Sequence, residues 1–134
     1  MTKSIKIDEV LERYISNNSY ELHPTQKEII NYNKNLGEIK RMQISITQAY
    51  FMQLLIKIKK VKKILEIGTF TGYSALSMAL AADDCFITCL DKNDKTSKVA
   101  TNYFNKAKVG KKINLIIGEA IESLNNLINP LNYL

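Results

Sequence analysis

Lys63-Ile-Leu-Glu-Ile-Gly-Thr-Phe-Thr-Gly-Tyr-Ser74 is the stretch of sequence that decides the fold. Residues 63–67 form a short apolar run, which is typical of a buried strand, and an amphipathic stretch near Gly72 to Ala82 follows and is predicted to be a helix. Gly68 permits a tight turn after the strand, and Gly72 permits close approach to the backbone at the helix start. A ligand could therefore sit over the backbone N–H groups, so a nucleotide-type site is plausible here.

Two more apolar runs follow, at residues 85–91 and 113–117, with a predicted helix near Asp94 to Lys108 between them. Strands that alternate with helices and are apolar throughout indicate a parallel sheet with right-handed crossovers. We therefore predict an α/β fold. It should be half of a doubly wound architecture, with about three parallel strands and helices on both faces.

The sequence divides into an N-terminal helical segment, residues 1–60, and the α/β unit, residues 61–134. The first helix is predicted from the spacing of Val10, Leu11, Tyr14 and Ile15. A capping-box pattern at Thr25-Gln-Lys-Glu28 predicts the start of a second helix, which ends near Gly37. A third helix is predicted over residues 46–59, with an apolar stripe interpreted as packing surface rather than a ligand cage: Tyr50, Phe51, Leu54, Leu55 and Ile58.

Composition narrows the class of protein. The 134 residues are 46% hydrophobic and 24% charged, which suits one folded domain. No apolar run reaches the roughly 20 residues of a membrane span, and the first residues lack the apolar core of a signal peptide, so we expect a cytoplasmic protein with no membrane partner. Cys85 and Cys89 would lie about 13 Å apart on one strand and are expected to be reduced and buried. His23 is the only histidine and is expected in a turn, so a zinc site has few ligands to draw on.

The net charge of +6 raises the question of a nucleic-acid partner. Arg13 and Arg41 are the only arginines among 19 basic residues, and base recognition favours arginine, so this reading is weak. The densest basic run, residues 57–63, is interpreted as a solvated helix C-terminus that leads into a strand.

Two more features converge on the same edge of the sheet. Asp91 ends the second strand, where a carboxylate can accept both hydroxyls of a ribose. Gly118-Glu-Ala120 ends the third strand, where its backbone can flank an adenine ring. The glycine spacing matches neither the dinucleotide fingerprint nor a P-loop. Adenosine without a polyphosphate fits these parts best.

Together with Met42-Gln-Ile-Ser45, the motifs over residues 38–128 resemble the S-adenosylmethionine-dependent O-methyltransferases of the catechol and caffeoyl-coenzyme A type. The resemblance implies a Rossmann-like class I methyltransferase fold, a bound S-adenosylmethionine and a small-molecule methyl acceptor. It implies cofactor contacts at nine positions: Ile44 lining the site, Glu66, Gly68 and Thr69 at the methionine end, Ser74 at the donor's carboxylate, Asp91 at the ribose, Ala120 at the adenine, and Gly72 and Tyr73 nearby.

Several of these residues also have a structural interpretation. Glu66 could be a strand-end carboxylate bound to backbone amides, and Ser74 an ordinary first-turn residue. Asp91 could form a turn or cap the next helix, a role for which Asp94 competes. The joint spacing of the motifs favours the functional interpretation.

The resemblance further implies a divalent metal, held by an Asp-Ala-Asp-Lys motif and a later Asp-Asn pair. Neither motif follows Ala120 in this sequence, so we assign no catalytic or metal-binding residue. Ile46 also stands where the family often has proline, and the interval from Glu66 to Asp91 is one residue short. We expect a chain that binds the donor and is inactive alone. The alternative is a non-catalytic cofactor-binding remnant, or one part of a split enzyme.

The exposed edge of the first strand is a further expectation. An unpaired edge beside apolar side chains is an aggregation hazard, so we predict that the N-terminal helices or a second chain cover it. The resemblance to dimeric proteins implies a homodimer or association with another chain.

Overall fold

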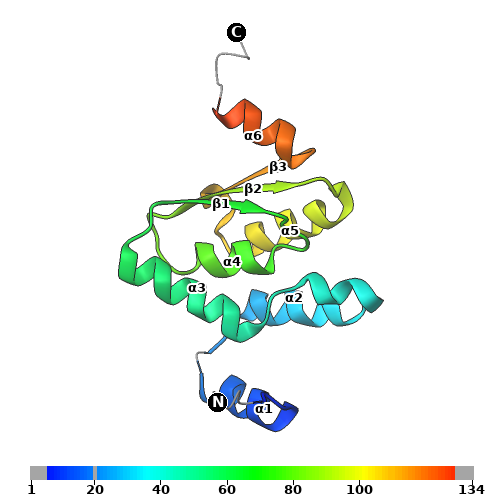
Figure 1. Cartoon of the computed structure of the whole chain (residues 1–134), viewed down its shortest axis with the longest axis vertical. Helices are drawn as coiled ribbons and strands as arrows, with labels where there is room; N and C mark the ends of the chain where they lie inside the picture. The colour runs from blue at the N-terminus through cyan, green and yellow to red at the C-terminus, as the bar shows by residue number, and fades with distance from the viewer. Residues whose placement is uncertain (1–5, 20, 129–134) are drawn as a thin grey trace, which may run out of the picture.

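The computed structural model describes residues 6–19 and 21–128 and is built around a three-stranded parallel sheet of order β1-β2-β3 (Figure 1). Leu65 in β1 lies opposite Thr88 in β2, which lies opposite Asn114 in β3. The α/β fold is confirmed, and the second strand begins one residue later than predicted. The strands are β1 Lys63–Ile67, β2 Phe86–Asp91 and β3 Ile113–Ile117.

Six α-helices and two 3-10 helices surround the sheet in the described residues. The predicted helices are present: the one over residues 46–59 matches to the residue, and those predicted to end near Gly37, Ala82 and Lys108 end earlier. The 3-10 helices and the last α-helix were not predicted. Their bounds are α1 Glu9–Asn18, α2 Pro24–Lys34, η1 Gly37–Met42, α3 Ile46–Lys59, α4 Tyr73–Ala79, α5 Asp94–Lys106, η2 Gly110–Lys112 and α6 Ala120–Ile128.

The helices form one thick layer below the sheet and a single cover above it (Figure 1). Below, α5 packs on β3, α4 packs on β2, and α3 lies beside α4. Above, α6 packs on β2 and is the only helix of the described chain on that face. The part of the 61–134 unit beyond Ile128 lies outside the described residues.

The core lies between the sheet and α4. Ile87 and Cys89 of β2 meet Ala75 and Leu76 of α4, and all four side chains are buried. Cys85 is buried as well, and neither cysteine forms a disulfide, as predicted. Because the sheet and α4 share this core, the strand ends are held in place and can position a site.

The start of α2 differs from the prediction. His23, not Thr25, is the N-cap: its Nδ1 accepts the Thr25 N–H at 3.2 Å. Gln26 Oε1 accepts the His23 N–H at 2.9 Å, which completes a capping box two residues earlier than expected. The physical reason is Pro24, which suits the first helical position because it has no N–H to satisfy.

The apolar stripe predicted for α3 is not the buried one. Ala49, Gln53 and Ile56 are buried against the rest of the protein, whereas the five apolar residues of the predicted stripe are exposed. Gln53 fixes this orientation, because its Nε2 donates to the Ser77 carbonyl of α4 at 2.6 Å. The helix is apolar on nearly all sides, so the pattern alone could not select the correct face.

The N-terminal helices do not cover the free edge of β1. Within the described residues, α2 and α3 pack on α4 instead, held by the buried bonds from Gln26 and Gln53 to Ser77. That half of the expectation is wrong, and cover by a second chain stays a prediction.

The basic run 57–63 is a solvated helix end, as interpreted. α3 ends at Lys60, which adopts the left-handed conformation, and the lysines of the run are exposed. Lys62 pairs with Asp84. In the part of the chain that the structure describes, no helix is long and apolar enough to span a membrane.

Candidate functional site

A cavity of about 630 Å³ opens at the carboxyl ends of all three strands. This is the edge at which open parallel sheets bind ligands. Its walls come from the strand ends, the turns that follow them, the 3-10 helix η1 and the starts of α5 and α6. The lining residues are Ile39, Met42, Ile67, Gly68, Phe70, Leu90, Asp91, Lys92, Asn93, Thr96, Gly118, Glu119 and Ala120.

The two glycines after β1 have different roles. Gly68 (φ +89°) lines the cavity, and no atom lies within 4 Å of where its Cβ would be, so the backbone is open to a ligand. Gly72 (φ +87°) is buried instead, and a Cβ there would come within 2.6 Å of Phe104. Gly72 therefore lets α4 begin close against α5, which differs from the ligand approach predicted for it.

Asp91 holds the turn between these glycines. Its Oδ2 accepts the N–H groups of Thr69 at 2.8 Å and Phe70 at 2.7 Å, and its Oδ1 accepts the N–H of Asn93 at 2.8 Å. A carboxylate has about four acceptor positions, so one remains for a ligand hydroxyl. Phe70 lies at φ +53°, a strained conformation for a bulky residue, which this clamp helps to maintain.

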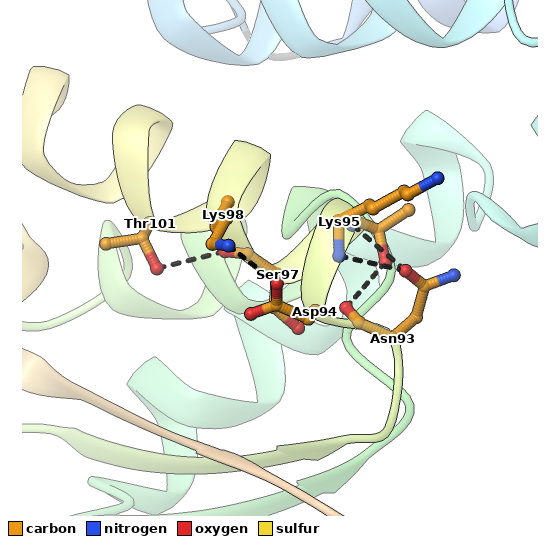
Figure 2. A network of polar contacts seen from close by, with 7 residues as sticks. Asn93, Asp94, Lys95, Ser97, Lys98 and Thr101 are labelled. Carbon is orange, nitrogen blue, oxygen red and sulfur yellow. Dashed lines mark hydrogen bonds and ion pairs between the residues drawn. The ribbon is translucent and has the colours of Figure 1, made fainter.

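Asn93, whose N–H donates to Asp91 Oδ1, is the N-cap of α5. Its Oδ1 accepts the N–H groups of Lys95 at 3.1 Å and Thr96 at 3.2 Å. Figure 2 shows Asn93 beside Lys95 at the start of the helix. Asp94 forms an ion pair with Lys98 at 2.6 Å on the surface. The helix cap is thus neither Asp91 nor Asp94, and the turn-forming interpretation of Asp91 is confirmed alongside its place in the cavity wall.

Glu66 directly precedes Ile67, which lines the cavity, and bonds to side chains rather than to backbone amides. Ser74 Oγ donates to one carboxylate oxygen, and Cys89 Sγ donates to the other at 3.4 Å. Burial raises the pKa of Glu66; the Ser74 and Cys89 bonds oppose the rise, and the Asp91 charge adds to it. Burial, together with Glu66, also raises the pKa of Cys89, so this thiol stays protonated.

The predicted site residues fall into three groups. Gly68, Asp91 and Ala120 line the cavity. Glu66, Thr69, Gly72 and Ser74 lie in the adjoining strand end, turn and helix start, of which Thr69 and Gly72 are buried. Tyr73 belongs to the core, and Ile44 is partly buried against it. Cofactor contacts of the nine residues stay predictions.

Several lining residues were not predicted from the sequence. Lys92 and Asn93 directly follow Asp91, and Thr96 lies five residues after it, so their closeness in sequence was a usable signal. Met42 begins a motif that carries the family resemblance, but no role was assigned to it. Ile39 had no signal, because it belongs to η1, a 3-10 helix without apolar periodicity. Lys92 and Glu119 pair at 3.7 Å, but both are largely exposed, so the pair contributes little to stability.

The comparisons with known proteins agree with this geometry. Residues 16–133 match the O-methyltransferase family. The chain is 33% identical to a caffeoyl-CoA O-methyltransferase of Populus kitakamiensis, over 94% of this chain and 55% of that protein. It is 35% identical to caffeoyl-CoA O-methyltransferase 2 of Zea mays, over 94% of this chain and 48% of that protein.

Solved structures give the same match. An O-methyltransferase from Bacillus cereus in complex with SAH superposes with a TM-score of 0.81 at 26% identity, over 90% of this chain and 55% of that one. The SAH-bound Podospora anserina methyltransferase PaMTH1 gives a TM-score of 0.81 at 25% identity, over 92% and 56%. The chain thus spans about half the length of the relatives that it matches.

Proposed function

The chain belongs to the O-methyltransferase family, and from this membership we propose that its cavity binds S-adenosylmethionine for methyl transfer to a hydroxyl of a small acceptor. The observation that carries the proposal is the cavity itself, where an open glycine turn, a strand-end carboxylate and a third-strand turn meet. We expect the protein to act in the cytoplasm.

The residues of the cavity suit this cofactor. A volume of about 630 Å³ falls in the range of small-molecule sites, roughly 300–1,000 Å³. Ile67, Leu90 and Met42 supply apolar surface for a base, and Asp91 retains an acceptor position for a ribose hydroxyl. Gly68 leaves its backbone uncovered.

The proposed contacts fall on three parts of the cofactor: its methionine end, its ribose and its adenine. Glu66 offers a carboxylate to the ammonium at the methionine end, and Ser74 can turn its hydroxyl from Glu66 to the cofactor's carboxylate. Asp91 takes the ribose and Ala120 the adenine. The other positions support these contacts: Ile44, Gly68, Thr69, Gly72 and Tyr73.

When bound, the cofactor supplies a methyl group on a sulfonium, which an acceptor oxygen attacks in line. The contribution of this chain is to orient the donor, and positioning of this kind supplies much of the rate in such reactions. Within residues 6–19 and 21–128, no group of three or more His, Cys, Asp or Glu could hold a metal. The described residues therefore do not fit the metal site that the resemblance implied.

A second candidate function is a donor-binding part of a split enzyme, inactive without another polypeptide. It is favoured by a separate observation: among the described residues, no strand pairs with the outer edge of β1.

Calorimetric titration with S-adenosylhomocysteine tests donor binding. We expect saturable binding to the wild-type chain and at least roughly tenfold weaker binding to Ala120→Trp, because the indole would fill space in the cavity. The matched control is Ile121→Trp, a neighbouring exposed position that does not line the cavity. No heat at high micromolar ligand, from a chain shown to be folded by circular dichroism, would contradict the proposal.

A further inference from the structure

Glu66 has a neighbour in β2 to which the proposed function gives no role. Cys89 is the direct cross-strand partner of Glu66 in the parallel pairing of β1 with β2. Paired residues of neighbouring strands point their side chains to the same face of the sheet. The Cys89 thiol donates to Glu66 Oε2 at 3.4 Å. The register of the two strands therefore sets this contact, which does not depend on the conformation of a loop.

Cys89 differs from Ser74, the other side chain that bonds to Glu66. Ser74 Oγ donates to Oε1 and is partly exposed, so its hydroxyl can turn to a ligand. Cys89 is fully buried in the core. Burial raises the pKa of its thiol, so the thiol keeps its proton and stays a donor. Cys89 is therefore the fixed donor to Glu66, and Ser74 is the movable one.

The charge of Glu66 depends on such donors. Burial raises the pKa of Glu66, the bonds from Ser74 and Cys89 oppose the rise, and the charge of Asp91 adds to it. Four groups face this carboxylate: Cys89 and Asp91 from β2, Ser74 from α4, and Thr69 from the turn after β1. Of these four, only Asp91 carries a charge. A neutral carboxyl would not attract an ammonium by charge, so a donor that keeps Glu66 ionised supports binding of the methionine end.

The same face of β2 also carries Asp91, because it lies two residues after Cys89. Asp91 accepts the N–H groups of Thr69 and Phe70. Thus β2 orders both parts of the β1 end. Cys89 acts on the carboxylate of Glu66, and Asp91 acts on the turn that follows.

We propose that Cys89 is a positioning residue for S-adenosylmethionine: its thiol holds Oε2 of Glu66, which leaves Oε1 directed to the ammonium of the cofactor. The inference rests on the proposed function, in which Ser74 turns from Glu66 to the cofactor's carboxylate. Once Ser74 has turned, Cys89 is the one that remains of the two side chains bonded to Glu66. Cys89 acts through Glu66 and not by contact with the cofactor.

Calorimetric titration with two ligands tests this role. S-adenosylhomocysteine carries the ammonium, whereas 5′-methylthioadenosine keeps the adenosine and lacks the amino-acid part. Cys89→Ala should weaken binding of S-adenosylhomocysteine roughly three- to tenfold, the range expected for one lost hydrogen bond. It should leave binding of 5′-methylthioadenosine unchanged, because that ligand makes no use of Glu66. A purely structural loss would weaken both ligands alike.

The pH profile of S-adenosylhomocysteine binding is a second readout. Because the Cys89 bond lowers the pKa of Glu66, its removal raises that pKa. Glu66 then takes up its proton at a higher pH. As the solution is acidified, the affinity of Cys89→Ala should therefore begin to fall at a higher pH than that of wild type.

Two variants complete the comparison. Cys89→Ser keeps a hydrogen-bond donor and should recover most of the affinity and the wild-type pH profile. Cys85→Ala deletes the same atoms at an equally buried position, but Cys85 faces Asp84 and Lys112 rather than Glu66. It should leave both titrations unchanged. Circular dichroism checks that each variant is folded.

Four results would overturn the inference. They are wild-type affinity for S-adenosylhomocysteine in Cys89→Ala, an equal loss of both ligands in that variant, the same losses in Cys85→Ala, or no recovery in Cys89→Ser. Each of these leaves the proposed function in place, because the wild-type chain still binds S-adenosylhomocysteine. A folded wild-type chain that does not bind S-adenosylhomocysteine contradicts the proposed function, and the inference with it.

Discussion

Helices α3 and α4 lie side by side in one layer, yet they relate to the rest of the protein in opposite ways. Six of the seven residues of α4 are buried, including Leu76 and Ala79. Only Ala49, Gln53 and Ile56 are buried among the fourteen residues of α3. The difference shows that apolar sequence does not by itself produce burial, because a helix buries only the faces that other elements cover.

The largest test of this comparison is the same substitution in both helices. Leu76→Ala should lower the free energy of unfolding by about 2–5 kcal/mol, because it removes a fully buried side chain and leaves a cavity. Leu54→Ala should change it by less than about 0.5 kcal/mol, because that side chain is about half exposed. Urea unfolding of both variants measures the difference. Equal losses would mean that α3 is covered in solution.

The contrast between the helices also explains what could be predicted from sequence. The strands at residues 63–67 and 113–117 were predicted to the residue, because short apolar runs between turn signals are local features. The buried face of α3 was not, since it depends on Gln53 bonding to Ser77, a residue 24 positions away. The sequence marks an apolar helix, but the neighbours of that helix decide which side is buried.

The same division applies to the candidate site. Gly68 and Asp91 were placed at the strand ends from local motifs, and both line the cavity. The clamp from Asp91 to Thr69 and Phe70 was not predicted, because it joins two turns that meet only through the pairing of β1 with β2. The role of Gly72 was missed for a similar reason, since Phe104 approaches it from α5.

A smaller effect is expected at this clamp, which orders the turn that leads into α4. Asp91→Asn replaces one of the two acceptor oxygens by a donor, so at least one of its backbone bonds is lost. We expect the free energy of unfolding to fall by about 1–2 kcal/mol. The matched control is Asp94→Asn, which removes only an exposed ion pair and should cost less than about 0.5 kcal/mol. Equal effects of the two variants would mean that the backbone bonds accepted by Asp91 do not stabilise the fold.

The smallest expected effect is a pH dependence of the free energy of unfolding. It arises at Glu66, which contacts α4. Glu66 contacts Ser74 of α4, and burial raises its pKa above the ordinary value of 4.5. Below that ordinary value the carboxyl is protonated in both the folded and the unfolded chain. As pH rises through the raised pKa, the unfolded chain gives up the proton first, so the folded state loses stability relative to the unfolded state.

Glu66→Gln should therefore lack this loss, so its free energy of unfolding relative to wild type should increase as pH rises above 4.5. Ser74→Ala should act in the opposite direction, because the Ser74 bond lowers the pKa of Glu66 and its removal makes the loss larger. Other carboxylates are common to all three chains, so their contributions cancel in these differences. Urea unfolding across the acidic range measures both. Parallel curves for wild type and Glu66→Gln would mean that Glu66 is solvated in the free chain, and that α4 does not bury its neighbours more tightly than α3 does.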